Sequence, residues 1–132
     1  VMYLAAVLPK DYRNDPGISA AETAIEMATI NGARALGMDK EVGSLEVGKR
    51  ADVIILNMWS PEWIPNYSEV QNLVYSADGR SVETVYINGR LVMDDRKVLT
   101  VNEDEIIARC MDLSDKLLRR TGLSVPGRWP IS

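Results

Sequence analysis

The stretch "GSLEVGKRADVIIL", residues 43–56, decides how the rest of the chain is interpreted. A glycine turn leads through Lys49 and Arg50 into Val53–Leu56, a short aliphatic run that predicts a mostly buried strand. A phosphate-binding loop needs Ser or Thr after the lysine and a helix after the loop. Here an arginine and then a strand follow, so we expect a solvated basic pair at a turn. We expect Asp52 to accept hydrogen bonds from loop amides rather than to do acid–base work.

The composition limits the classes of function. The 132 residues are one average domain long, and the net charge of −4 gives no reason to expect a nucleic-acid partner. The longest aliphatic run has four residues, far short of the roughly 20 that span a membrane, so no membrane partner is expected. A single cysteine excludes an internal disulfide and predicts a reducing, cytoplasmic location.

The sequence contains no histidine. Histidine is the commonest metal ligand and the most usual general base near neutral pH. A His-ligated metal site, a Ser-His-Asp triad and a Cys-His pair therefore cannot be built from these residues alone. We assign no catalytic, cofactor-binding or metal-binding residue to this chain. Cys110 lies in the apolar stripe of a predicted helix, which indicates a small buried hydrophobic residue rather than a nucleophile.

The N-terminal part predicts helices. Residues 1–10 are typical of the end of a helix already under way, and residues 10–17 of a loop. Ser19–Glu22 matches a capping box at the start of a second helix. An alanine-rich stripe follows at helical spacing and predicts close packing against another element: Ala21, Ala24, Ile25 and Ala28.

Residues 57–67 form a loop with two tryptophans, two prolines and a tyrosine. Such aromatic side chains either line a binding cleft or fold back as a lid over a small core, and the second reading is favoured. Residues 69–79 predict a short helical turn that ends at glycine.

Asn88-Gly89 between two alternating apolar stretches is the strongest short signature of a β-hairpin. A two-residue loop would place Val85 opposite Val92 and Tyr86 opposite Leu91. Further along, Glu83 would face Asp94, and this like-charge pair predicts that the pairing ends there.

A second capping box, Asn102–Glu105, starts a C-terminal helix with one wide apolar face. That face carries Ile106, Ile107, Cys110, Leu113, Leu117 and Leu118. Gly122 is expected to end the helix, and residues 124–132 read as an extended tail.

In their order and spacing, "NGARALG", "GSLEVGKRADVIIL" and "YINGRLVM" resemble the C-terminal region of the amidohydrolase superfamily, in its cytosine-deaminase-like branch. That branch includes methylthioadenosine/S-adenosylhomocysteine deaminases and triazine chlorohydrolases. The resemblance covers roughly residues 1–120. It implies an α/β parent, a (β/α)8 (TIM) barrel with a composite β-sandwich beside it.

The resemblance implies a division of the chain into three segments. Residues 1–38 would be the end of the metal-dependent hydrolase barrel, residues 39–101 a β-sandwich segment, and residues 102–132 the C-terminal helix and tail. The family's metal ligands would all precede residue 1, so no family site residue maps onto this chain. Zinc or iron is expected in the full-length parent and no cofactor in this chain.

Three functions stay open at this point. The chain is expected to be the C-terminal portion of a metal-dependent amidohydrolase that deaminates a purine or related heterocycle, non-catalytic on its own. Alternatively it is a free-standing assembly or interaction module, or one half of a split hydrolase. The expected partners are the missing N-terminal barrel and, through the open strand edge and the alanine-rich face, a second copy in a homo-oligomer.

Overall fold

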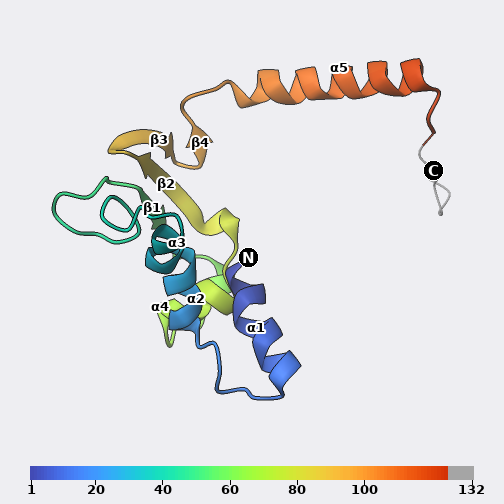
Figure 1. The fold of residues 1–132 in the computed structure, drawn as a ribbon. Helices are drawn as coiled ribbons and strands as arrows, with labels where there is room; N and C mark the ends of the chain where they lie inside the picture. The colour runs from blue at the N-terminus through green and yellow to red at the C-terminus, as the bar shows by residue number, and fades with distance from the viewer. Residues whose placement is uncertain (125–132) are drawn as a thin grey trace. The chain divides into compact units, whose positions relative to one another are not determined.

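The computed structural model describes residues 1–124, and Figure 1 shows the order of their elements. The chain divides into two units, Val1–Leu99 and the part from Thr100 onward, and each unit is described by itself. The predicted tail at 124–132 lies outside the described residues apart from Ser124. No helix among residues 1–124 is both long and apolar enough to cross a membrane.

The first unit contains four short helices: α1 Met2–Arg13, α2 Ala21–Ala28, α3 Ile30–Ala35 and α4 Glu69–Tyr75. Helix α1 confirms the helical reading of residues 1–10 but continues to Arg13, so the loop predicted from residue 10 was placed too early. It ends at Asn14, whose left-handed backbone (φ 50°) directs its amide to the carbonyls of the last turn.

The predicted capping box at Ser19–Glu22 was wrong. The N-cap of α2 is Ala20, and no side chain caps this helix. Ser19 stands one residue too early and has a left-handed φ of 51°, so its hydroxyl does not occupy the capping position. The helix forms regardless, because its alanine face packs against neighbouring helices.

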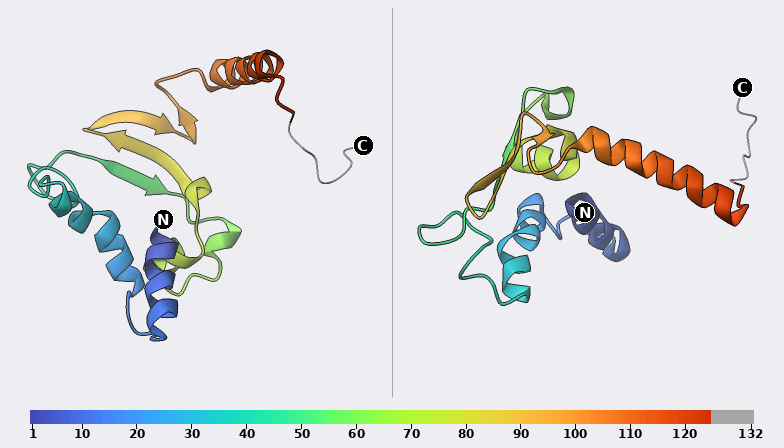
Figure 2. Two further views of the ribbon diagram at one scale, coloured as in Figure 1. Left: turned by 45° about the vertical axis from the view of Figure 1, so that its right-hand side comes forward. Right: turned by 90° about the horizontal axis from the view of Figure 1, so that it is seen from above.

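The core of the first unit is small and built from alanines. Ala6 of α1, Ala21 and Ala24 of α2 and Val74 of α4 are almost fully buried and form one cluster. Alanine on both facing surfaces allows α1 and α2 to approach closely, as Figure 2 shows, and Val74 of α4 packs against them. Ala21 and Ala24 of the predicted alanine stripe are therefore covered by this chain's own helices, whereas Ala28 is exposed.

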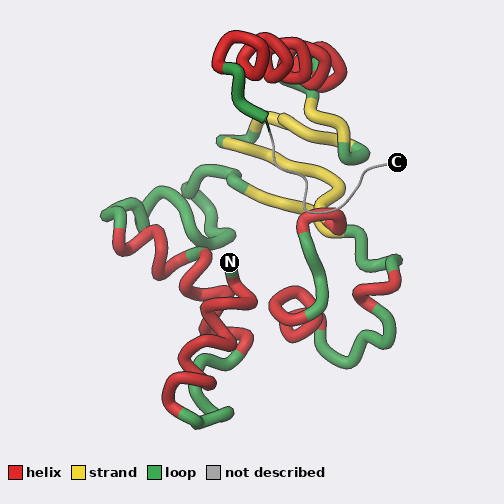
Figure 3. Tube along the Cα trace, turned by 90° about the vertical axis from the view of Figure 1, so that its right-hand side faces the viewer, coloured by secondary structure: helices red, strands yellow, loops and turns green. Residues whose placement is uncertain are grey.

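The first unit also contains a four-stranded antiparallel sheet, in which the strand order is β1-β2-β3-β4. The strands are β1 Val53–Leu56, β2 Val82–Ile87, β3 Arg90–Asp94 and β4 Lys97–Val98, drawn in yellow in Figure 3. Strand β1 forms at the predicted place but lies at the edge of the sheet. Ile54 and Ile55 are about half exposed, so the predicted mostly buried strand was wrong.

The β2–β3 hairpin turns at Asn88-Gly89, where both residues have positive φ (51° and 74°) as a type I′ turn requires. Tyr86 pairs with Leu91, as predicted. Val85 pairs with Met93 and not with Val92, because a bulge between Val85 and Tyr86 shifts the register by one residue.

Helix α5, Glu103–Thr121, belongs to the second unit. Its N-terminal cap is confirmed, since the Asn102 side chain accepts a hydrogen bond from the Glu105 amide at 3.2 Å. Gly122 ends the helix in a left-handed conformation, also as predicted. Cys110 is exposed, contrary to the buried position predicted for it, because no residue of α5 is buried within its own unit.

Candidate functional site

The basic pair in the opening stretch has a structural role. The Lys49 ammonium donates to the Ser44 hydroxyl at 2.6 Å and lies 3.1 Å from the Glu46 carboxylate. The hydrogen bond from Ser44, followed by Lys49, lowers the pKa of Glu46. The Lys49 side chain is only 11% exposed, so the predicted solvated lysine was wrong. Gly48 forms the expected turn with a φ of 94°.

Asp52 joins this loop to the hairpin. Its carboxylate accepts a hydrogen bond from the Asn88 amide at 2.6 Å, and the neighbouring Ala51 carbonyl accepts one from the Gly89 amide at 2.9 Å. The predicted role of Asp52 as an acceptor for loop amides is confirmed. Both turn amides of the hairpin are thus held by the residues that precede β1.

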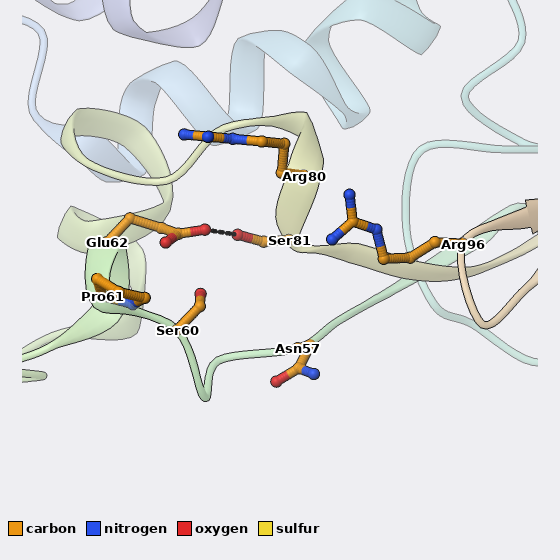
Figure 4. Close-up of a pocket in the computed structure, with 7 residues that line it drawn as sticks. All are labelled: Asn57, Ser60, Pro61, Glu62, Arg80, Ser81 and Arg96. Carbon is orange, nitrogen blue, oxygen red and sulfur yellow. Dashed lines mark hydrogen bonds between the residues drawn. The ribbon is translucent and has the colours of Figure 1, made fainter.

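A polar hollow with a volume of about 420 Å³ lies where the loop after β1 meets the start of β2. Figure 4 shows its lining residues: Asn57, Ser60, Pro61, Glu62, Arg80, Ser81 and Arg96. The lining contains the Glu62 carboxylate and the guanidiniums of Arg80 and Arg96. Asp78, which is paired with Arg80, adds a second carboxylate. The positive charges of this group are therefore matched by negative ones.

Ser81 is the centre of the hydrogen bonding in this hollow and is nearly fully buried. Its hydroxyl donates to Glu62 at 3.0 Å and accepts from the indole N–H of Trp63 at 2.9 Å. The pKa of Glu62 is lowered, first by its own backbone amide and then by the Ser81 hydroxyl. The Ser60 hydroxyl also lowers this pKa, although it forms no hydrogen bond of normal geometry. A carboxylate with a lowered pKa is a weaker base than a free one, so this hydrogen bond does not by itself indicate an activated serine.

Arg80 is held in place on the other side of the hollow. Its guanidinium makes a two-point contact with Asp78, with distances of 2.9 Å from Nε and 2.7 Å from Nη2 to one carboxylate oxygen and 3.1 Å from Nε to the other. These hydrogen bonds lower the pKa of Asp78 and raise that of Arg80. Both groups stay charged and paired at neutral pH. The hollow is a structural joint between the short 3-10 helices η1, Pro61–Trp63, and η2, Gly79–Ser81.

The aromatic loop at 57–67 divides its side chains between two environments. Trp63 is 1% exposed and fills the space under the loop, as the lid reading predicts. The Asn72 amide fixes the loop by donating to the carbonyls of Trp63 and Pro65 at 3.0 and 3.3 Å. Trp59 and Tyr67 are almost fully exposed, so the lid reading holds for one of the three aromatic residues.

A metal does not fit the residues described here. Residues 1–124 contain no group of three or more His, Cys, Asp and Glu side chains that could hold an ion. Structural and catalytic zinc sites use three or four such ligands. The assignment of no metal ligand and no catalytic residue to this chain therefore remains a prediction from the sequence.

Sequence reasoning did not predict the Glu62–Ser81–Trp63 group. Ser81 lies 18 residues after Trp63, and serine before a strand carries no local pattern that points to a distant partner. The signal that could have indicated this group is the tryptophan in a short loop, because a buried indole N–H needs a hydrogen-bond acceptor.

With this geometry in place, the fold can be compared with solved structures. The chain superimposes on an adenosine deaminase from Xanthomonas campestris, solved with bound zinc, with a TM-score of 0.83 and 31% identity, over 87% of this chain and 26% of that one. It also matches an atrazine chlorohydrolase from Arthrobacter aurescens complexed with zinc, with a TM-score of 0.75 and 20% identity over 85% and 25% of the two chains, a likeness in fold alone. Both of these proteins were solved with zinc, and this chain matches about a quarter of each.

The sequence then gives the family. Residues 1–92 match the model of the amidohydrolase family, and the chain belongs to that family. It is 46% identical over 105 residues to a 5-methylthioadenosine/S-adenosylhomocysteine deaminase of Moorella thermoacetica, covering 80% of this chain and 24% of that enzyme. It is 39% identical over 116 residues to a 5'-deoxyadenosine deaminase of Methanosarcina acetivorans, covering 88% and 26%. The predicted family resemblance is confirmed, and the chain spans about a quarter of the length of the curated relatives it matches.

Proposed function

We propose that this chain is the C-terminal portion of a metal-dependent amidohydrolase that hydrolyses a carbon–nitrogen bond, by deamination of a purine or related heterocycle. The observation that carries the proposal is the 46% identity, over 105 residues, to an enzyme named for deamination of 5-methylthioadenosine and S-adenosylhomocysteine. The chain's own polar groups support a structural contribution to such an enzyme, because Asp52 binds the hairpin turn and Ser81 binds Glu62 and Trp63 of η1.

In this proposal residues 1–38 complete the barrel, residues 39–101 form a sandwich segment and residues 102–132 form the closing helix and tail. The zinc or iron of the parent would be held by residues outside this chain and would supply Lewis-acid activation of water for hydrolysis. The partner of this chain is then the N-terminal barrel of the same enzyme, in a cytoplasmic homo-oligomer.

The proposal is tested by a chimera. The matching C-terminal segment of the Moorella thermoacetica deaminase is replaced by residues 1–124 of this chain, and ammonia release from 5-methylthioadenosine is measured. We expect the chimera to retain deamination and to bind zinc, whereas the same enzyme truncated before the segment is inactive. A folded, metal-loaded chimera without deaminase activity would contradict the proposal.

A further inference from the structure

The chain contains two Asn-Gly pairs, Asn31-Gly32 and Asn88-Gly89. This dipeptide is prone to spontaneous deamidation, because glycine has no side chain to hinder attack by its own backbone nitrogen. The attack is directed at the side-chain carbonyl carbon, Cγ, of the preceding asparagine. Whether a pair reacts therefore depends on how the structure holds the nitrogen of its glycine.

The reaction replaces a side-chain amide with a carboxylate. At Asn88 the Gly89 nitrogen would lose its proton to a base from solvent and form a bond to Cγ, while the bond from Cγ to Nδ2 breaks and ammonia leaves. The product is a cyclic succinimide in which the former Gly89 nitrogen carries no hydrogen. Water then opens the ring to aspartate or to isoaspartate, whose backbone runs through the former side chain.

The structure holds the Gly89 nitrogen in its unreactive form. Its N–H donates to the Ala51 carbonyl at 2.9 Å, and the Asn88 N–H donates to the Asp52 carboxylate at 2.6 Å. These two hydrogen bonds are called the turn clamp. Ring closure removes the hydrogen that Gly89 donates, so the succinimide and the bond to Ala51 exclude each other. We propose that Asn88 is a latent deamidation site whose conversion the turn clamp suppresses.

The backbone of the turn acts in the same direction. Asn88 and Gly89 both have positive φ, and Ile87 pairs with Arg90 directly beside them. A type I′ turn fixes both backbone dihedral angles of its first central residue. Bringing the Gly89 nitrogen onto Cγ requires rotation about the Cα–C bond of Asn88. That rotation is opposed by the strand pairing on one side and by the turn clamp on the other, and all of these groups belong to the first unit.

The second pair provides an internal reference. Asn31 lies in α3, where its side-chain oxygen accepts a hydrogen bond from Arg34 at 2.9 Å. This contact lies within α3 and involves neither Asp52 nor the hairpin. A change that loosens the turn clamp alone should therefore accelerate deamidation at Asn88 and leave the rate at Asn31 unchanged.

The first test compares the folded and unfolded forms of the 132-residue chain. The chain is incubated at mildly alkaline pH with and without guanidinium chloride, digested with trypsin and analysed by mass spectrometry. Peptide 81–90 contains Asn88 as its single asparagine, and peptide 14–34 contains Asn31. We expect Asn88 to deamidate at least about tenfold more slowly in the folded chain than in the unfolded one. Equal rates in the two forms would overturn the proposal.

The second test assigns the protection to the turn clamp. Asp52→Ala removes the acceptor of the Asn88 amide, whereas Asp52→Asn keeps a side-chain oxygen at this position. Because an equilibrium changes about tenfold on loss of one hydrogen bond to a charged group, we expect Asp52→Ala to accelerate deamidation at Asn88 about tenfold and Asp52→Asn less than threefold. The rate at Asn31 should be the same in both variants, and an unchanged rate at Asn88 in Asp52→Ala would overturn the role of the clamp.

A third variant separates the clamp from a general loss of stability. Ser81→Ala removes the acceptor of the Trp63 indole without changing a group of the turn clamp. We expect it to change the rate at Asn88 less than about threefold. If Ser81→Ala accelerated Asn88 as much as Asp52→Ala does, or if Asp52→Ala accelerated both asparagines equally, global unfolding would control the reaction and the proposal would be wrong.

Discussion

Gly43 and Gly48 allow the packing of the opening stretch to be separated from its backbone conformation. The two glycines have nearly the same positive φ, 95° and 94°. A Cβ on Gly43 would lie 2.8 Å from the Ala33 Cβ and 3.0 Å from the Ile30 Cα of α3, whereas a Cβ on Gly48 would meet no atom within 4 Å. The two Gly→Ala variants therefore share the strain of the left-handed backbone and differ in the steric contact.

The shared strain is worth about 1–3 kcal/mol of folding stability. The overpacking against α3 adds about 1–3 kcal/mol in Gly43→Ala alone, because the atoms it meets include backbone atoms that cannot move aside. Urea unfolding followed by circular dichroism measures both variants. With a slope of about 1–3 kcal/mol per molar urea, we expect the midpoint of Gly43→Ala to lie about 1 M below that of Gly48→Ala.

Equal midpoints for the two variants would show that the loop does not pack on α3 as described. Midpoints equal to that of the unmodified chain would refute the positive φ at both positions. The slope serves as an internal control, because a changed slope would indicate altered compactness of the unfolded or native state and not a local clash.

Three further predictions concern the turn, the buried serine and the metal. Gly89→Val should destabilise the chain by about 1–3 kcal/mol through backbone strain alone, and an unchanged melting temperature would contradict the turn at this position. Ser81→Ala should cost about 1–3 kcal/mol at pH 7, because it leaves the buried indole N–H of Trp63 without its acceptor; tryptophan fluorescence during unfolding measures it. The pKa of Glu62 is lowered in the folded chain, so its stabilising contribution is present above the usual value of 4.5 and is lost as the pH falls through the lower folded pKa. Ser81→Ala removes part of that lowering, so the acid-induced loss of stability should be smaller in the variant, and an identical pH profile would contradict the Ser81–Glu62 bond. Finally, elemental analysis of the purified chain should find no stoichiometric zinc or iron, since the sequence has no histidine and one cysteine.

Local signals in the sequence were sufficient for several elements. The Asn88-Gly89 turn and the Asn102 cap of α5 each depend on neighbouring residues, and the structure has both. Asp52 was predicted to bind loop amides, but the sequence did not identify its partner, the amide of Asn88. Several of the failures came where a distant contact decides. The bulge beside Tyr86 moved Met93 into register, and no local pattern marks a bulge.

Burial was harder to predict than element type. An apolar run predicts a strand at Val53–Leu56, but its burial depends on whether another strand lies beside it. The same reasoning failed for Cys110, because an apolar stripe shows only which face of a helix seeks a partner. Lys49 was predicted to be solvated but is largely buried, because the nearby Ser44 hydroxyl and Glu46 carboxylate contact its ammonium group. The family resemblance, in contrast, depended on the order of short motifs and was confirmed.

The fastening of the β2–β3 turn has a consequence for protein engineering. The tip of a two-residue hairpin is often chosen for inserting an epitope tag or a reporter domain, since such a loop ordinarily faces solvent. Here the amides of Asn88 and Gly89 are bound to Asp52 and Ala51 on the neighbouring segment. An insertion at this tip would open the turn and also break the two hydrogen bonds that tie it to the segment before β1. Fusions to this chain are therefore better placed in the loop between α1 and α2, where residues 14–20 connect two helices without fastening the sheet.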